Sequence, residues 1–154
     1  MIYTIKAGDH ECSPRKVNIG FRDDYEWNVR FDSSCIYYFP DKEDQYDVNK
    51  LVGRGYMNGD SARFGWRWWQ GQLELLAYIH DNGSITKTLI TKLVIGKQYK
   101  LGIYKSSDIY RFEANGVVIP IHKSRNRIIS YPMYPYFGGT QAAPHEIKIE
   151  ITAL

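Results

Sequence analysis

The chain has 154 residues, a formal net charge of +3 and an apolar fraction of 44%, which is enough for one domain with a well-buried core. Its basic residues are scattered, so no nucleic-acid partner is expected. No apolar run approaches the roughly 20 residues that a membrane helix needs, so no membrane insertion is expected. An aromatic fraction of 15%, with 13 tyrosines, argues against disorder. We therefore expect a single β-sandwich domain over residues 1–154.

Nothing at the start of the chain predicts export. Residues 1–6 carry no apolar signal core and alternate like a strand, so we expect a cytoplasmic location, or a virion protein released at lysis. The two cysteines, Cys12 and Cys35, are too few for a disulfide framework. They could pair, but a reduced, buried role is favoured. Without Cys-x-x-Cys or His-x-x-x-His spacing, neither a metal nor a cofactor is expected.

Short runs of alternating polarity follow one another along the whole chain and predict strands. The expected strands cover residues 3–6, 16–21, 26–31, 36–39, 52–56, 62–69, 72–80, 85–90, 99–105, 109–114, 117–121, 127–131 and 146–152. The best helix candidate is the short segment 44–51, because no longer window has helical periodicity. The pattern predicts an all-β fold, a two-sheet antiparallel jelly-roll sandwich with little or no helix.

Turn residues set the expected connections between several of these strands. Asn82-Gly83 and Asn115-Gly116 tolerate positive φ and lie between extended runs, so each predicts a tight hairpin. Pro120 cannot donate to a strand neighbour, which predicts an edge strand over residues 117–121. The last strand predicts a buried isoleucine ladder at Ile147, Ile149 and Ile151.

Residues 61–69 alternate with period two, and a strand sends alternate side chains to opposite faces. One face is apolar and predicts core packing, with Ala62, Phe64, Trp66 and Trp68. The other is cationic and partly aromatic, with Arg63, Gly65, Arg67 and Trp69. Arginine forks grip carboxylates or sugar hydroxyls and an indole stacks on a sugar ring, so this is a candidate ligand face. The alternative is a plain solvated face, and a bulge near Gln70-Gly71 would turn Trp69 inward.

A second aromatic cluster lies in the Pro/Gly-rich segment 130–145, which carries Tyr131, Tyr134, Tyr136 and Phe137. Recognition residues are often carried on loops held by a rigid scaffold, so this loop is a candidate site. The alternative is a structural crossover whose tyrosines close one end of the sandwich. The acidic segment 41–47 has oxygen ligands for calcium at Asp41, Glu43, Asp44 and Asp47, but its spacing favours a solvated loop.

Catalytic signatures are sparse. There is no Gly-x-Ser-x-Gly elbow, phosphate loop or His-Glu-x-x-His motif. Glycoside hydrolysis needs two facing carboxylates, and Glu74 has no convincing partner in the sequence. Tyr78 and His80 share a strand face and with Arg63 would form a lyase-like set, although a polar outer face is favoured.

The Asn-Gly hairpin over residues 109–121, the tryptophan-rich strand and the final isoleucine ladder resemble the concanavalin A-like (laminin-G and lectin type) jelly-roll class. The chain is also similar to small uncharacterised proteins of gut bacteria and tailed phages. The segments that carry this second resemblance cover residues 5–10, 47–51, 61–67, 74–83, 134–139 and 143–147. It implies a phage-associated setting and no particular activity.

Jelly-roll polysaccharide lyases are similar through Gln72-Leu73-Glu74 and Tyr78-Ile79-His80. The chain is shorter than those enzymes and lacks the Tyr-x-Lys motif that supplies their catalytic tyrosine.

These observations favour a protein that is not an enzyme: a non-catalytic interaction module that binds a glycan or a protein, as a phage virion or surface accessory component. Its binding residues would be Arg63, Arg67, Trp69, Tyr134 and Tyr136. A homo-oligomer or a virion assembly would fit this setting. Two alternatives stay open: a purely structural virion protein with no small ligand, and a small carbohydrate-active enzyme, either a lyase or a glycosidase.

Overall fold

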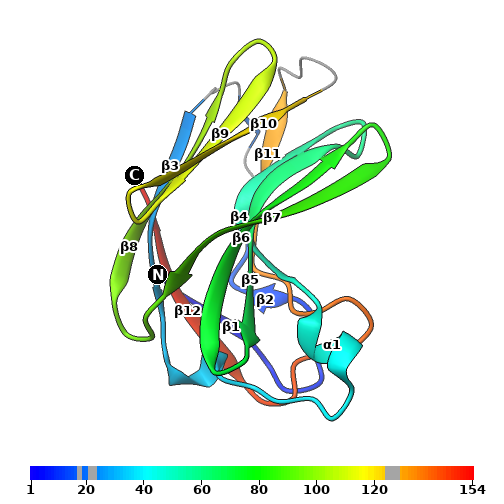
Figure 1. Cartoon of the computed structure of the whole chain (residues 1–154), viewed down its shortest axis with the longest axis vertical. Coiled ribbons are helices and arrows are strands. Elements are labelled where there is room, and N and C mark those ends of the chain that lie inside the picture. The colour runs from blue at the N-terminus through cyan, green and yellow to red at the C-terminus, as the bar shows by residue number, and fades with distance from the viewer. Residues whose placement is uncertain (17–18, 21–23, 124–128) are drawn as a thin grey trace.

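The computed structural model describes residues 1–16, 19–20, 24–123 and 129–154, and it confirms the all-β sandwich (Figure 1). A seven-stranded antiparallel sheet has the order β10-β9-β8-β3-β12-β1-β2, and a five-stranded antiparallel sheet has the order β11-β4-β5-β6-β7. The strands are β1 (Ile2–Ile5), β2 (Cys12–Ser13), β3 (Asp24–Phe31), β4 (Asn49–Tyr56), β5 (Ser61–Trp69), β6 (Gln72–Asp81), β7 (Ser84–Leu93), β8 (Gln98–Lys105), β9 (Ile109–Ala114), β10 (Val117–His122), β11 (Ser130–Met133) and β12 (Ile147–Ala153).

Two short helical segments complete the described chain, the 3-10 turn η1 (Ser33–Cys35) and the helix α1 (Lys42–Tyr46). No helix in the described residues is long and apolar enough to span a membrane. The expected strand over residues 16–21 falls partly on positions outside the described residues.

The turn predictions are confirmed. Asn82 and Asn115 adopt φ of 51°, and the glycine after each also has positive φ. Gln70 and Gly71 form a third turn of this kind, with φ of 49° and 73°. Edge strand β10 carries Pro120, as expected.

The core lies between the two sheets and is rich in aromatic rings. Phe64 and Trp66 of β5 are fully buried, as predicted, and so are Phe31 and Phe112 of the facing sheet. Phe64 meets Phe112 edge-on at 5.2 Å between ring centres, and Trp66 meets Phe31 at 5.5 Å. The inward isoleucine ladder of β12 is also confirmed, with Ile147, Ile149 and Ile151 all buried.

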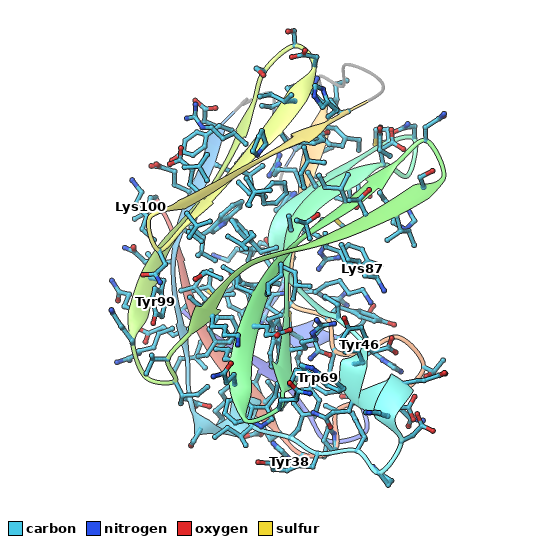
Figure 2. All side chains as sticks on the ribbon, in the orientation of Figure 1. Tyr38, Tyr46, Trp69, Lys87, Tyr99 and Lys100 are labelled. Carbon is cyan, nitrogen blue, oxygen red and sulfur yellow. The ribbon has the colours of Figure 1, made fainter. Side chains whose placement is uncertain are left out.

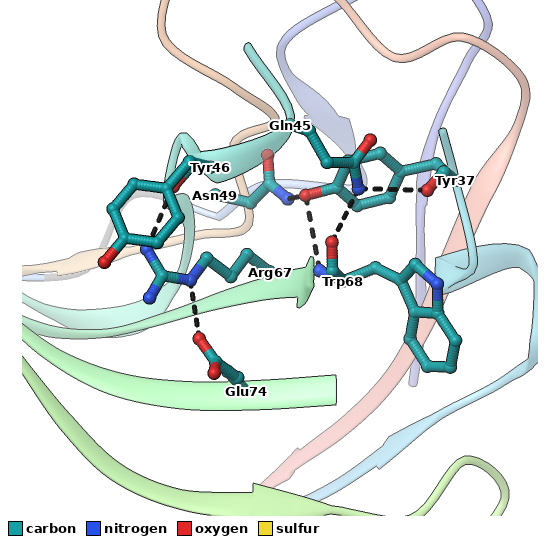
Figure 3. Close-up of polar contacts among 7 residues, drawn as sticks. All are labelled: Tyr37, Gln45, Tyr46, Asn49, Arg67, Trp68 and Glu74. Atoms are coloured by element: carbon teal, nitrogen blue, oxygen red, sulfur yellow. Dashed lines mark hydrogen bonds and ion pairs between the residues drawn. The ribbon is translucent and has the colours of Figure 1, made fainter. Parts of the chain in front are cut away.

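The predicted strand over residues 36–39 is wrong, because a side chain takes the place of its neighbouring strand. Gln45 Oε1 accepts from the Phe39 amide at 2.6 Å, and Gln45 Nε2 donates to the Tyr37 carbonyl at 3.1 Å (Figure 3). The backbone of this segment therefore has polar partners without joining a sheet.

The helix expected over residues 44–51 is also misplaced. Asp41 caps it by accepting from the amides of Glu43 and Asp44, so α1 starts early. It ends before Asn49, where β4 begins.

Helix α1 is fastened to the end of β5 by buried polar contacts (Figure 3). Gln45 Nε2 donates to the Trp68 carbonyl at 2.6 Å. The Tyr37 hydroxyl accepts from Asn49 Nδ2 at 2.9 Å and from the Trp68 amide at 3.4 Å. The Gln45 contact, with the bond from Arg67 Nη1 to the Tyr46 carbonyl at 3.0 Å, holds α1 against the outer face of the five-stranded sheet, which is the face turned away from the seven-stranded sheet.

Replacing Trp66 by alanine should lower the free energy of unfolding by about 3–5 kcal/mol, because it empties a fully buried indole site. Chemical denaturation measures this loss. Trp69→Ala is the matched control, since Trp69 is half-buried and meets Tyr46 on the outer face. An equal loss in the two variants would contradict the assignment of Trp66 to the core and of Trp69 to the outer face.

The fold should also weaken at alkaline pH. Burial raises the pKa of Tyr37 to about 12, so the unfolded chain releases this proton at lower pH than the folded chain does. Stability present below pH 10 is therefore lost as the pH rises from about 10 to about 12. Denaturation at several pH values should show that the free energy of unfolding falls less between about pH 10 and about pH 12 for Tyr37→Phe than for the unmodified chain.

Candidate functional site

Three successive hairpins align one residue from each of four strands across the outer face of the five-stranded sheet. Gly53 of β4 pairs with Arg63 of β5, Arg63 with Tyr78 of β6, and Tyr78 with Lys87 of β7. Adjacent strands lie about 4.8 Å apart, so this row runs perpendicular to the strands across the width of the sheet. Figure 2 shows Lys87 on the same side of the molecule as Tyr46 and Trp69, with Lys100 on the opposite side.

Arg63 is a buried cation at the centre of this row. It is 7% exposed, and its Nη2 donates to the carbonyls of Leu51 at 3.2 Å and Tyr134 at 2.7 Å. Its buried Nε has no hydrogen-bond partner among the described residues. No carboxylate in the described part of the chain forms an ion pair with it. Burial lowers the pKa of Arg63 to about 10, so its positive charge is unusually costly here.

Glycines make this arrangement sterically feasible. A Cβ on Gly53 would lie 2.3 Å from the Cβ of Arg63 and from the Ala62 carbonyl oxygen. On Gly65 it would lie 2.5 Å from Val48, which packs with Leu76 and Tyr78 in a small apolar cluster. Because these two glycines have no side chains, neighbouring side chains on this face can extend over the backbone there.

Lys50 lies beside Arg63 on the same face. Its Nζ donates to the Gly138 carbonyl at 2.8 Å and lies over two rings, 5.3 Å from the centre of Tyr78 and 5.8 Å from that of Tyr136. Burial lowers the pKa of Lys50, and the charges of Arg63 and Lys87 lower it further. The field around this ammonium is therefore positive.

The Tyr78 ring lies close to a lysine and to a histidine. Lys87 Nζ lies 5.8 Å from the Tyr78 ring centre, and the His80 ring stacks along Tyr78 at 6.4 Å. Burial raises the pKa of the Tyr78 hydroxyl, while Arg63 opposes that rise. Tyr78 is therefore a neutral hydroxyl at physiological pH, and His80 beside it is half-buried.

Strand β11 and the segment after it form a wall beside these residues. Arg63, Tyr131, Tyr134 and Tyr136 line a groove of about 210 Å³, and Tyr136 also borders a neighbouring groove of about 600 Å³. The Tyr136 backbone exchanges two hydrogen bonds with Lys50, which places it beside β4. His10 stacks on the Tyr136 ring at 5.3 Å and its Nδ1 donates to the Phe137 carbonyl at 2.8 Å.

The two interpretations of this tyrosine-rich loop therefore apply to different residues. Phe137 is buried and packs on Tyr37 and Trp66 in the core. Tyr131, Tyr134 and Tyr136 are half-buried and line the groove.

Arg67 and Trp69 share the outer face with Arg63 but lie against Tyr46 of α1, and Figure 3 shows Arg67 beside Tyr46. The β5–β6 register is continuous to Trp69, so no bulge turns it inward. Arg67 Nε forms a buried ion pair with Glu74 at 2.6 Å, and its guanidinium stacks on Tyr46 at 3.7 Å. Trp69 meets the same Tyr46 ring at 4.8 Å.

Of the five predicted binding residues, the structure thus brings Arg63, Tyr134 and Tyr136 together and separates Arg67 and Trp69 from them. Sequence reasoning did not find Lys50, Lys87 or His10. Lys87 is as far beyond the Asn82-Gly83 turn as Tyr78 is before it, so hairpin register would have found it.

No group of three or more His, Cys, Asp or Glu side chains in the described residues is arranged to hold a metal ion. The acidic segment instead supplies the Asp41 cap of α1. Cys12 and Cys35 are buried, unpaired thiols, and burial raises the pKa of Cys12 to about 11. Neither is therefore an activated nucleophile.

Solved structures similar to this fold include several polysaccharide lyases. An alginate lyase from Pseudomonas aeruginosa is 10% identical, with a TM-score of 0.60, over 87% of this chain and 65% of that one. The alginate lyase AlyC3 is 11% identical, with a TM-score of 0.67, over 99% and 74%, and it has also been solved with dimannuronate. A family 18 polysaccharide lyase is 8% identical, with a TM-score of 0.56, over 100% and 87%.

No family model matches the chain. No curated protein matches it in sequence. At identities of 8–11% the structural likenesses show the concanavalin-like jelly-roll fold, and the chain spans just under two thirds of the Pseudomonas enzyme.

These comparisons bear on the expected activity and on the expected family resemblances. The expectation that the chain is not an enzyme is wrong, because its structural neighbours are polysaccharide lyases. They favour the carbohydrate-active enzyme, which stood as an alternative, over the non-catalytic module. The jelly-roll class is confirmed, whereas the resemblance to gut-bacterial and phage proteins and the virion setting find no support in them.

Removing one partner of the Arg67–Glu74 pair should strongly destabilise the fold. Glu74→Ala leaves a buried guanidinium without its carboxylate, which should cost about 3–5 kcal/mol in unfolding free energy. The control is Glu150→Ala, which breaks the Arg30–Glu150 pair, whose side chains are 52% and 40% exposed. Its cost should stay below about 1 kcal/mol. Similar losses in the two variants would contradict the structural role of Glu74.

Proposed function

We propose that this chain is a polysaccharide lyase that cleaves an acidic, uronate-containing polysaccharide by β-elimination. The observation that carries the proposal is Arg63, a buried guanidinium with no carboxylate partner in the described residues, beside a groove lined by tyrosines. A buried charge without a counter-ion is costly, and such charges concentrate at functional sites. The fold shared with alginate lyases, one of them solved with dimannuronate, supports the same substrate class.

The chemistry explains why cations and tyrosines would be needed together. In a uronate the proton on C5 is α to a carboxylate, and its removal places negative charge on the carboxylate oxygens. The C4–O4 bond then breaks, a C4=C5 double bond forms, and O4 leaves with a proton. The reaction thus requires cations at the carboxylate, a base near C5 and an acid near O4.

Each requirement has a candidate side chain on the outer face. Arg63, Lys50 and Lys87 supply positive charge around Tyr78. Tyr136 lies over Lys50 on one side, and His80 lies two strands away on β6. The Tyr78 ring is close to both groups, since its centre lies 5.3 Å from Lys50 Nζ and 6.4 Å from the centre of the His80 ring. We assign proton transfer to Tyr136 and His80.

The position of Tyr136 bears on the missing Tyr-x-Lys motif. Tyr136-Phe137-Gly138 has the tyrosine of that motif but a glycine in place of its lysine. Lys50, from β4, donates to the carbonyl of that glycine. A lysine ammonium is thus present beside Tyr136, although it comes from another strand.

A lyase fits these residues better than a glycosidase does. Glycoside hydrolysis uses two carboxylates on either side of the scissile bond. On this face Glu74 is committed to its buried pair with Arg67. Asp47 is the one carboxylate whose charge acts on both Lys50 and Tyr78 in the described residues, so a facing pair is lacking there.

Tyr136→Phe should abolish most of the lyase activity without unfolding the protein. It removes the phenol that would transfer the proton and keeps the ring that stacks on His10. We expect kcat to fall by about 10²–10⁴-fold, the usual loss for a general acid or base. The ultraviolet absorbance of the new C4=C5 double bond, followed on alginate and other polyuronates, measures the rate.

Tyr38→Phe is the matched control, because the Tyr38 side chain is 73% exposed and lies at the lower end of the molecule in Figure 2, away from Lys87. Its activity should equal that of the unmodified protein. Full activity of Tyr136→Phe would exclude Tyr136 from proton transfer, and a wild-type chain without eliminase activity on any polyuronate would refute the proposed function.

A further inference from the structure

The surroundings of Lys50 differ from those of a lysine whose ammonium is fully hydrogen-bonded inside a fold, and from those of a lysine exposed to solvent. Lys50 is half-buried, and its Nζ has three N–H donors. The Gly138 carbonyl is the one hydrogen-bond acceptor that the described residues offer it. The faces of Tyr78 and Tyr136 flank it at 5.3 Å and 5.8 Å. Two of its donors therefore remain for a ligand that lies between these tyrosines.

The charges around Lys50 select the kind of ligand. Arg63 and Lys87 carry the same sign and lower its pKa, as burial does. Asp47 is the acid whose charge reaches it, but Asp47 forms no ion pair with it. An anion bound here would relieve the repulsion among the three cations.

The two neighbouring cations are less suited to direct contact with a ligand. The Arg63 guanidinium is 7% exposed, and its Nη2 is already bonded to two carbonyls. Lys87 is exposed on the edge strand β7, where its long side chain is free to move. Lys50 alone is both anchored and accessible.

We propose that Lys50 binds the carboxylate of the uronate held between Tyr78 and Tyr136, and that it thereby selects the free acid over its methyl ester. This inference rests on the proposed function and deepens it, because it assigns the substrate's charge state to one residue. An ester carbonyl has no net charge, so it gains little from the ammonium, whereas a carboxylate forms a charge-assisted hydrogen bond.

The experiment compares one oligouronate in two forms, the free acid and the methyl ester. Binding is measured by titration calorimetry and cleavage by double-bond absorbance. For Lys50→Gln we expect the affinity for the free acid to fall by about 10- to 100-fold, as for loss of a charge-assisted contact. The affinity for the ester should stay unchanged, so the preference of the wild-type protein for the free acid disappears.

Lys97→Gln is the matched control, because it removes an exposed lysine that lies over a different tyrosine ring, that of Tyr99, on the opposite side of the molecule from Lys87 (Figure 2). Its effect should be under about threefold and should vanish at high salt. Lys50→Arg keeps the charge and should retain part of the preference for the free acid. Equal losses for acid and ester in Lys50→Gln would show that Lys50 only supports the Gly138 loop, and would overturn the inference.

The outcomes separate this inference from the proposed function. If the wild-type protein cleaves the oligouronate and Lys50→Gln keeps the preference for the free acid, the inference alone fails. If the wild-type protein binds the free acid without cleaving it and Lys50→Gln loses that binding, the lyase proposal fails and the inference stands. If the wild-type protein neither binds nor cleaves it, both are wrong.

Discussion

The alternation of β5 ties the core of this protein to its candidate site. Phe64 and Trp66 point between the sheets and are fully buried, whereas Arg63 points to the outer face from the same strand. A shift of one residue in register would expose the indole and place the guanidinium in the aromatic core. The packing around Trp66 therefore holds Arg63 in position as firmly as any contact of the arginine itself.

Arg63 and Arg67 show how partners distinguish a structural charge from a functional one. Both are 7% exposed and lie on the same face of the same strand. Arg67 has a carboxylate at 2.6 Å, a backbone carbonyl and an aromatic ring. Arg63 has carbonyls but no carboxylate among the described residues. The free-energy cost of burying its charge is thus only partly offset inside the fold. A bound anion would offset the rest of that cost.

Local sequence signals predicted most of the fold, because strand alternation and tight turns depend on neighbouring residues. The failures arose where a distant side chain intervened, as Gln45 does for residues 36–39. The Arg63–Tyr78 and Arg67–Glu74 pairs were also within reach, since both follow from a two-residue turn at Gln70-Gly71. Gln70 is an unusual residue for positive φ, and this weakened the signal.

Lys50 could not have been placed from sequence alone. The β4–β5 register shifts between Lys50 and Gly53, so counting back from the Arg63 pair gives the wrong neighbour for Lys50. Tyr136 reaches Lys50 through an isolated bridge between segments more than 80 residues apart. A site assembled in this way leaves no short motif, and this explains why the lysine beside Tyr136 was missed when the Tyr-x-Lys spacing was absent. Such a site is recognised instead from a buried charge, here that of Arg63, which has no carboxylate partner among the described residues.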